Sequence, residues 1–149
     1  SRNAPVEGKR TMALGKAEVL SEGSDAALYT YGPSAEEAMK ACRLLKEQGI
    51  SLSVLNFTTV KPLDAEAVLA HAKGKKAVFT LEEHAPVGGI GSAVAEVLAQ
   101  AGAGVPLHVL AVPEGAKNTG PYPELLDYYG LSGAEAAKRI AAVLHDCEK

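Results

Sequence analysis

Short apolar segments alternate regularly with amphipathic segments along this chain, and this alternation limits the folds it can adopt more than any other feature. The apolar segments favour strands, and turn-forming residues bound them. They cover residues 17–20, 26–31, 50–57, 76–81 and 105–112. Strands that alternate with helices predict a parallel sheet covered by helices on both faces. The sequence therefore predicts an α/β fold, whereas the strand order does not follow from the pattern.

Residues with specific capping chemistry mark the ends of the intervening helices. Ser34 and Glu37 have the spacing of a capping box, in which a hydroxyl and a carboxylate satisfy free amides at a helix start. Ser132 and Glu135 repeat this spacing, and Asp64 is the expected N-cap of a further helix. The last three helices are expected over residues 92–101, 124–129 and 132–147. Glycines are expected to end three helices: Gly49, Gly74 and Gly130.

The size and composition of the chain exclude several classes of protein. Its 149 residues suffice for one domain with a real core. Hydrophobic residues make up 47% and charged residues 22%, which is typical of a globular protein. The formal net charge of −3 gives no basic surface for nucleic acid. No apolar run approaches the roughly 20 residues that span a bilayer. Neither nucleic acid nor a membrane is therefore an expected partner.

The N-terminal residues and the two cysteines bear on the context of the chain. Residues 1–10 contain proline, glycine and charges, lack the apolar core of a signal peptide, and are interpreted as a linker from an upstream segment. Cys42 and Cys147 form no CxxC pair and are typical of free thiols in a cytoplasmic protein. A cytoplasmic location is therefore expected.

The most informative local sequence is Glu82-Glu83-His84, which directly follows the apolar segment 76–81. Open α/β sheets place functional groups in the crevice beyond the carboxyl ends of their strands. Two carboxylates and an imidazole could form an acid–base group. However, adjacent loop residues point in different directions, and no nucleophile with an oriented base is evident. We favour the alternative that one glutamate caps or pairs locally while the other faces a partner.

A glycine-rich turn with Gly88, Gly89 and Gly91 follows, and it begins like a dinucleotide-binding fingerprint. Val94 holds the position of the last small residue of that pattern, and no acidic residue lies about 20 positions further on. The preceding glutamates would also repel a pyrophosphate. The glycines are therefore expected to permit a tight turn and a close approach of helix to strand.

Three tyrosines gather with prolines and leucines late in the chain: Tyr122, Tyr128 and Tyr129. Tyrosine combines a large contact area with a polar tip, which suits a subunit or domain interface. Ordinary packing beneath a loop is equally compatible with this pattern. The histidines are not spaced at i,i+4 and none is close to a cysteine, so a zinc site is not expected.

Five motifs follow one another in a fixed order. They are residues 14–25, residues 41–54, Val60-Lys61-Pro62-Leu63-Asp64, Glu82-Glu83-His84 with residues 88–94, and Leu125-Leu126 with Tyr129-Gly130-Leu131. In this order they resemble the C-terminal domain of the transketolase family. That group also includes 1-deoxyxylulose-5-phosphate synthase and the β subunits of 2-oxoacid dehydrogenases. Residues 119–121 followed by 124–126 look more like transketolase than the synthase.

The resemblance implies a particular version of the α/β fold. This version is a three-layer α/β/α sandwich whose mixed, mostly parallel sheet has five strands in the order 1-3-2-4-5, with strand 1 antiparallel. Residues 17–20 would form the antiparallel edge. Ser34 and His84 would converge at the switch point between the strands that end at Tyr31 and Leu81. Residues 14–149 would form the domain, and residues 1–13 the tail of a preceding pyrimidine-binding domain.

The resemblance also implies an enzyme, although one whose chemistry lies elsewhere. Transketolases transfer a two-carbon ketol unit between sugar phosphates with thiamine diphosphate and Mg²⁺. The GDG…N motif that holds the cofactor in this family is absent here. No catalytic, cofactor-binding or metal-binding residue is therefore assigned, and the segment alone is expected to be inactive. The possible crevice or interface residues are Ser34, Glu82, Glu83, His84, Gly88 and Gly89.

The expected partners follow from the same resemblance. They are the upstream thiamine-binding and pyrimidine-binding domains, or a subunit that carries them, and a second copy in a homodimer. The domain would support dimerisation and the architecture of the active site. Two alternatives stay open: the equivalent domain of the synthase or of a dehydrogenase β subunit, and a free-standing module that binds a small ligand.

Overall fold

The computed structural model describes residues 13–147, so the predicted linker over residues 1–13 lies outside the described residues except for its last one. The strands are β1 (Ala17–Ser21), β2 (Ala26–Thr30), β3 (Leu52–Phe57), β4 (Ala77–Leu81) and β5 (Leu107–Leu110). The helices are α1 (Ser34–Glu47), α2 (Ala65–Ala72), α3 (Ile90–Gln100), α4 (Tyr122–Tyr128) and α5 (Gly133–Asp146). None of the helices in this described range is long and apolar enough to cross a membrane.

The five strands form one sheet in the order β1-β3-β2-β4-β5. β1 runs antiparallel to β3, and the other neighbouring strands are parallel. This order and the antiparallel edge confirm the version of the α/β fold that the family resemblance implied. β2 lies at the centre, where all five of its residues are fully buried. Its continuous apolar run reflects a strand with helices on both faces.

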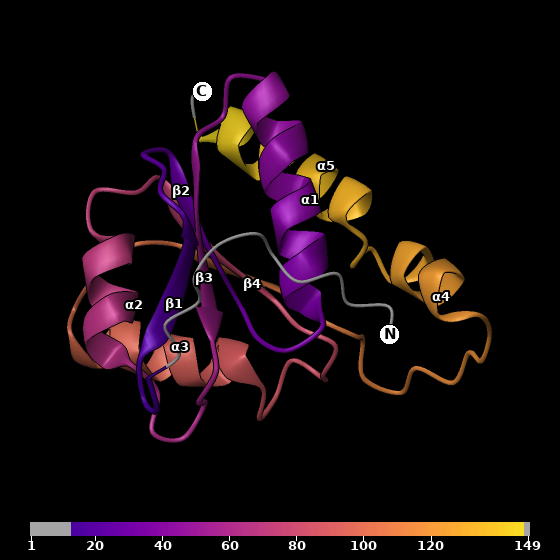
Figure 1. Cartoon of the computed structure of the whole chain (residues 1–149), viewed down its shortest axis with the longest axis horizontal. Coiled ribbons are helices and arrows are strands. Elements are labelled where there is room, and N and C mark those ends of the chain that lie inside the picture. The colour runs from indigo at the N-terminus through magenta and orange to yellow at the C-terminus, as the bar shows by residue number, and fades with distance from the viewer. Residues whose placement is uncertain (1–12, 148–149) are drawn as a thin grey trace.

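The helices cover the sheet on two sides, as Figure 1 shows: α1 and α5 lie together on one face, and α2 and α3 on the other. Alternate residues of each strand point to opposite faces. Leu28 and Phe79 therefore contribute to the core under α1 and α5, while Tyr29 and Val78 contribute to the core under α2 and α3. Both faces are apolar, which makes the molecule a three-layer sandwich.

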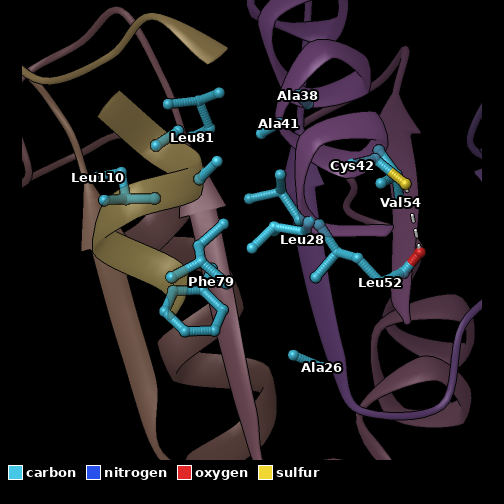
Figure 2. Packing of buried hydrophobic residues seen from close by; sticks show 14 of the residues in the cluster. Ala26, Leu28, Ala38, Ala41, Cys42, Leu52, Val54, Phe79, Leu81 and Leu110 are labelled. Atoms are coloured by element: carbon cyan, nitrogen blue, oxygen red, sulfur yellow. Dashed lines mark hydrogen bonds between the residues drawn. The ribbon is translucent and has the colours of Figure 1, made fainter. Parts of the chain in front are cut away.

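The core under α1 and α5 is built from leucines and one phenylalanine against small helix residues. Figure 2 shows Leu28 and Phe79 of neighbouring strands turned toward this layer, with Ala41 and Cys42 on the facing side of α1. Small side chains on the helix permit a close approach to the sheet. Cys42 is buried and its thiol contacts the Leu52 carbonyl oxygen at 3.7 Å. Cys42 therefore packs as a small buried side chain in this core.

The approach of α5 to α1 depends on Gly133, the first residue of α5. A Cβ at this position would lie 2.4 Å from the Lys40 Cβ, so a larger residue would force the helices apart. The Gly133 N–H donates to the Glu37 carboxylate at 2.6 Å, which satisfies one free amide at the start of α5. Ser132 provides the other cap, because its hydroxyl accepts from the Glu135 N–H at 3.4 Å.

Two predicted caps have different outcomes. Asp64 is the N-cap of α2, as expected, and its carboxylate accepts from the Ala67 N–H at 3.2 Å. The prediction of a capping box that begins at Ser34 is wrong. Ser34 is the first residue of α1, Pro33 holds the cap position, and no side chain caps this helix. The Ser34 hydroxyl instead donates to Glu83 at 3.3 Å, because the end of β4 brings a carboxylate within reach.

Replacing Asp64 should destabilise the domain, because this carboxylate also joins β1 to α2. Besides capping α2, it accepts from the Ala17 N–H at 3.0 Å. Asp64→Ala would leave two N–H groups unpaired and should lower the free energy of unfolding by about 1–3 kcal/mol in urea denaturation. Glu66→Gln is the matched control, since Glu66 is exposed and pairs only at the surface with Lys16. Equal stability of the two variants would contradict this role.

The contribution of Asp64 should also depend on pH. Burial would raise the pKa of this carboxyl, but the N–H bonds from Ala17 and Ala67 and the charge of Lys16 outweigh it, so the pKa lies below its ordinary value of 3.8. The unfolded chain then binds the proton more readily. The stabilisation is therefore complete above the ordinary value and disappears as pH falls through the lower folded-state pKa. The difference in stability between the native chain and Asp64→Ala should shrink over that acid range, and a constant difference would refute the assignment.

Candidate functional site

The candidate site lies beyond the carboxyl ends of β2 and β4, the two strands at the middle of the sheet. α1 follows β2 and packs on one face, whereas α3 follows β4 and packs on the other. The chain therefore turns in opposite directions from two neighbouring strands, which is a topological switch point. The residues that follow these strands are Ser34 on one side and Glu82, Glu83 and His84 on the other.

Glu82 is fully buried and serves the start of α3. One carboxylate oxygen accepts from the Ile90 N–H at 2.8 Å, and the other accepts from the Gly91 N–H at 2.9 Å. The first N–H groups of a helix have no partner within the helix, and the helix dipole favours negative charge at this end. Glu82 thus supplies to α3 the cap that Gly89, at the N-cap position, cannot provide. This geometry confirms the interpretation that one glutamate caps locally.

The glycines of the turn make room for this carboxylate. A Cβ on Gly89 would lie 1.8 Å from a Glu82 carboxylate oxygen, and a Cβ on Gly91 would lie 2.8 Å from the other oxygen. Gly88 has a positive φ of 84° and makes the tight turn. The expected tight turn and close approach are therefore confirmed. Different glycines meet these two needs. Gly88 provides the backbone conformation of the turn, whereas Gly89 and Gly91 leave space for the carboxylate.

The same arrangement bears on phosphate binding. A dinucleotide site needs the free N–H groups and positive end of a helix to face a pyrophosphate. At α3 those N–H groups are already bonded to a buried carboxylate. Burial raises the pKa of the Glu82 carboxyl above its ordinary value, although the bonds from Gly91 and Ile90 act in the opposite direction. The turn is therefore unsuited to hold a phosphate.

Glu83 points away from Glu82 and joins three elements at the rim of the crevice. Its Oε1 accepts from the Tyr122 hydroxyl at 2.6 Å and from the Ser34 hydroxyl at 3.3 Å. The start of α4 and the start of α1 are thereby tied to the end of β4. Burial, and then the neighbouring Glu83 carboxylate, raise the pKa of the Tyr122 hydroxyl above its ordinary value. The hydroxyl therefore stays a donor across the neutral range.

His84 does not meet Ser34 as expected. Its side chain is exposed, and its Nδ1 lies 2.8 Å from the adjacent Ala85 carbonyl oxygen. The polar partner of Ser34 is Glu83, one residue earlier. The three consecutive residues Glu82, Glu83 and His84 thus have three separate sets of contacts. They do not converge on one reacting centre, so the geometry offers no acid–base group.

A groove that sequence reasoning did not anticipate lies beside Glu83, between α1 and α4. We call it the α1–α4 groove. It has a volume of about 860 Å³ and is lined by Pro33, Glu36, Glu37, Lys40, Glu83, Pro121, Tyr122, Pro123 and Leu126. The lining residues are separated by up to 93 positions in the sequence, so no local pattern could reveal the groove. The Glu83 carboxylate joins its two walls, because it accepts from Ser34 at the start of α1 and from Tyr122 at the start of α4.

The tyrosines of α4 lie mostly at the surface. Tyr122 is 44% exposed and Tyr128 69% exposed, whereas Leu126 of the same helix is buried. The Tyr128 ring packs edge to face on Tyr129, with centroids 5.1 Å apart. Of the two alternatives, packing beneath a loop describes Leu126 but not Tyr128. The exposed rings leave an aromatic surface of the kind found at interfaces.

Metal ligands do not assemble in the part of the chain that the structure describes. Among residues 13–147, no three His, Cys, Asp or Glu side chains are placed so that they could hold a metal ion. His108 lies in β5 and stacks on Phe79 with ring centroids 5.3 Å apart. This contact packs the His108 ring against its neighbour on the sheet.

Comparison with known proteins places this fold in a family. The family profile described as "Transketolase, C-terminal domain" matches residues 15–135. The chain is 39% identical over 134 residues to a "Putative transketolase C-terminal section" of Methanocaldococcus jannaschii, covering 90% of the chain and 42% of that protein. It is 41% identical over 136 residues to a 1-deoxy-D-xylulose-5-phosphate synthase of Synechococcus sp., covering 91% of the chain and 21% of that protein.

Solved structures show the same similarity. A split-gene transketolase described as an inactive beta4 tetramer matches with a TM-score of 0.76 and 31% identity, over 91% of this chain and 42% of that one. A transketolase mutant from Pichia stipitis matches with a TM-score of 0.67 and 16% identity, over 88% of this chain and 18% of that one, and supports the fold alone. The chain thus spans less than half the length of these relatives.

The fit between Glu82 and Gly89 can be tested with a double-mutant cycle. Glu82→Ala should destabilise the domain, because it leaves two buried N–H groups without acceptors, at a cost of about 2–4 kcal/mol. Gly89→Ala should also destabilise it, because the new Cβ collides with the carboxylate. When both changes are combined, the collision disappears, so the double variant should lose less stability than the sum of the two. Urea denaturation measures all four free energies.

Glu83→Gln is the control for this cycle, since it changes a neighbouring carboxylate that does not touch Gly89. It should combine additively with Gly89→Ala. If the losses of stability caused by Glu82→Ala and Gly89→Ala add exactly, the Glu82 carboxylate is not the reason that position 89 requires glycine.

Proposed function

The chain belongs to the transketolase C-terminal domain family, and we propose that it is the non-catalytic structural domain of a thiamine-diphosphate-dependent transketolase. The full enzyme would transfer a two-carbon ketol unit between sugar phosphates. In this proposal the chemistry takes place in upstream thiamine-binding and pyrimidine-binding domains, or in a subunit that carries them, and residues 1–13 form the tail of the preceding domain. Such an enzyme would work in the cytoplasm.

One observation carries the non-catalytic part of the proposal. Glu82 is the first residue after β4, and both of its oxygens are bonded to the start of α3. Glu83 is likewise bonded to Ser34 and Tyr122. These carboxylates hold elements of the fold together, because their hydrogen bonds join the end of β4 to the starts of α1, α3 and α4. The arrangement supports a role in architecture and not in catalysis.

The described residues at the switch point do not fit the diphosphate of thiamine diphosphate. A diphosphate needs N–H donors or cations, whereas the switch point presents carboxylates to the crevice, and its helix N–H groups are already used. The GDG…N sequence that the family uses for the cofactor is also absent. We therefore place the cofactor on other domains of the complete enzyme and derive no step through it.

Support for a dimer comes from the surface. The exposed ring of Tyr128 and the exposed side chain of Val87 near the glycine turn are large apolar groups, at 69% and 73% exposure. Aromatic residues are enriched in the buried centres of subunit interfaces. We propose that this domain contributes such contacts to a homodimer of the complete enzyme, and that it thereby supports the architecture of the active site.

The equivalent domain of 1-deoxy-D-xylulose-5-phosphate synthase is the second candidate, and one finding favours it. The synthase of Synechococcus sp. shares 41% identity with the chain, slightly more than the transketolase section of Methanocaldococcus jannaschii at 39%. The structural similarity to a split-gene transketolase, at a TM-score of 0.76, favours the first candidate.

Binding of the cofactor by the isolated chain tests the non-catalytic role. Titration calorimetry with thiamine diphosphate and Mg²⁺ should give no heat of binding at protein concentrations near 100 μM, a range in which micromolar affinity would be evident. The complete enzyme, which includes the upstream domains, serves as the positive control. Micromolar binding by residues 1–149 alone would overturn the proposal.

Activity of the complete protein separates the two candidates. With the upstream domains present, it should transfer two carbons from a ketose phosphate to an aldose phosphate and should not consume pyruvate. Consumption of pyruvate in place of the ketose phosphate would assign the domain to the synthase or to a 2-oxoacid dehydrogenase β subunit.

A further inference from the structure

The α1–α4 groove is lined both by apolar residues and by carboxylates, and the proposed function uses neither. Prolines and the Tyr122 ring form much of its wall, and the ring keeps 44% of its area exposed. Grooves lined by aromatic rings and prolines suit extended peptide segments that contain proline. The shape and surface of the groove therefore favour a polypeptide strand over a compact ligand.

The charge of the groove favours a basic occupant. Three carboxylates line it, those of Glu36, Glu37 and Glu83, against the single ammonium of Lys40. Glu36 and Glu37 share this lysine, at 3.1 Å and 2.7 Å. The side chain of Glu36 is 54% exposed, so its carboxylate remains open to a second cation. An arginine could pair with such a carboxylate while its guanidinium plane stacks on the neighbouring tyrosine.

We propose that the α1–α4 groove binds the basic segment formed by residues 1–12 of this chain. This segment carries the complementary charge: Arg2, Lys9 and Arg10 against Glu7, a net of two positive side chains. It also contains Pro5, whose ring suits an apolar wall of prolines and tyrosine. The segment lies outside the described residues, and its fit to the groove rests on its charges and its proline.

The end of the domain at which the chain enters supports the pairing. β1 begins at Ala17, opposite Phe57 at the end of β3, and the Gly15 N–H donates to the Thr59 hydroxyl just beyond that strand. The chain therefore enters at the carboxyl ends of the parallel strands, the same end as the groove. β1 and β4 are three strand spacings apart, about 14 Å. Twelve extended residues reach up to about 40 Å, which is more than enough.

Docking of this segment would fix the direction in which the polypeptide leaves the domain. The inference does not depend on the proposed function, because it concerns only residues of this chain. A second copy could instead offer its own residues 1–12 to the groove, and a stray cation could neutralise Glu36. Both occupants predict different behaviour in the experiment below.

NMR of the full chain labelled with ¹⁵N tests the proposal through the amide signals of Lys9 and Arg10. Glu36→Gln removes one groove carboxylate while Lys40 keeps Glu37 as its partner. These amide signals should then move toward the positions of an unstructured peptide, and Glu36→Lys should move them further. About 1 M salt, which screens charges beyond roughly 3 Å, should move the native signals in the same direction. Glu96→Gln is the control, since Glu96 is exposed on α3 across the sheet.

The reciprocal variant makes the test independent of Glu36. Arg10→Gln should shift the amide signals of groove residues such as Tyr122 and leave those of α3 unchanged. The proposal is overturned if Lys9 and Arg10 already give unstructured-peptide signals in the native chain, or if Glu96→Gln moves them as much as Glu36→Gln does. If the signals move with protein concentration, the groove binds residues 1–12 of a second copy. If the effect of Glu36→Gln is confined to the signals of α1, the groove binds only small cations.

Discussion

The arrangement of strand and helix at the candidate site depends on the hydrogen bonds that the buried Glu82 carboxylate makes to the start of α3. The carboxylate lies where β4 ends, and its two oxygens bond the first N–H groups of α3. A full charge buried at a strand end is costly unless it is paired, and here the helix start provides the pairing. The carboxylate fills the space beside Gly89 and Gly91, so a side chain at either position would collide with it in this arrangement.

Other polar groups extend this arrangement to the remaining elements. Glu83 ties the starts of α1 and α4 to the end of β4 through Ser34 and Tyr122. Glu37 caps the start of α5, where Gly133 lets the two helices touch. The polar residues of the switch point therefore serve the fold. Because these groups are bonded within the domain, we propose that the chemistry lies in other domains and that this domain has a supporting role.

The α/β fold class could be predicted from the sequence because its signals are local, whereas the strand order came only from the family resemblance. Continuous apolar runs such as β2 mark buried strands, and Asp64 and Ser132 mark helix starts by the same chemistry in any context. Ser34 shows where local reasoning fails: its spacing to Glu37 is that of a capping box, but β4 brings Glu83 close enough to take the hydroxyl. The role of Glu82 could be stated only as one of two alternatives, because its partners lie eight and nine residues away across a turn. The α1–α4 groove could not be predicted, since its walls meet only through tertiary packing.

Amide hydrogen exchange at Ile90 and Gly91 tests the central claim most directly. The first N–H groups of a helix normally exchange quickly, because no carbonyl within the helix accepts them. If Glu82 holds these two groups in the buried arrangement described above, they should exchange as slowly as amides in the interior of α3, such as that of Leu98. Exchange of Ile90 and Gly91 as fast as that of an exposed loop amide would show that the carboxylate does not hold this helix, and would contradict the account.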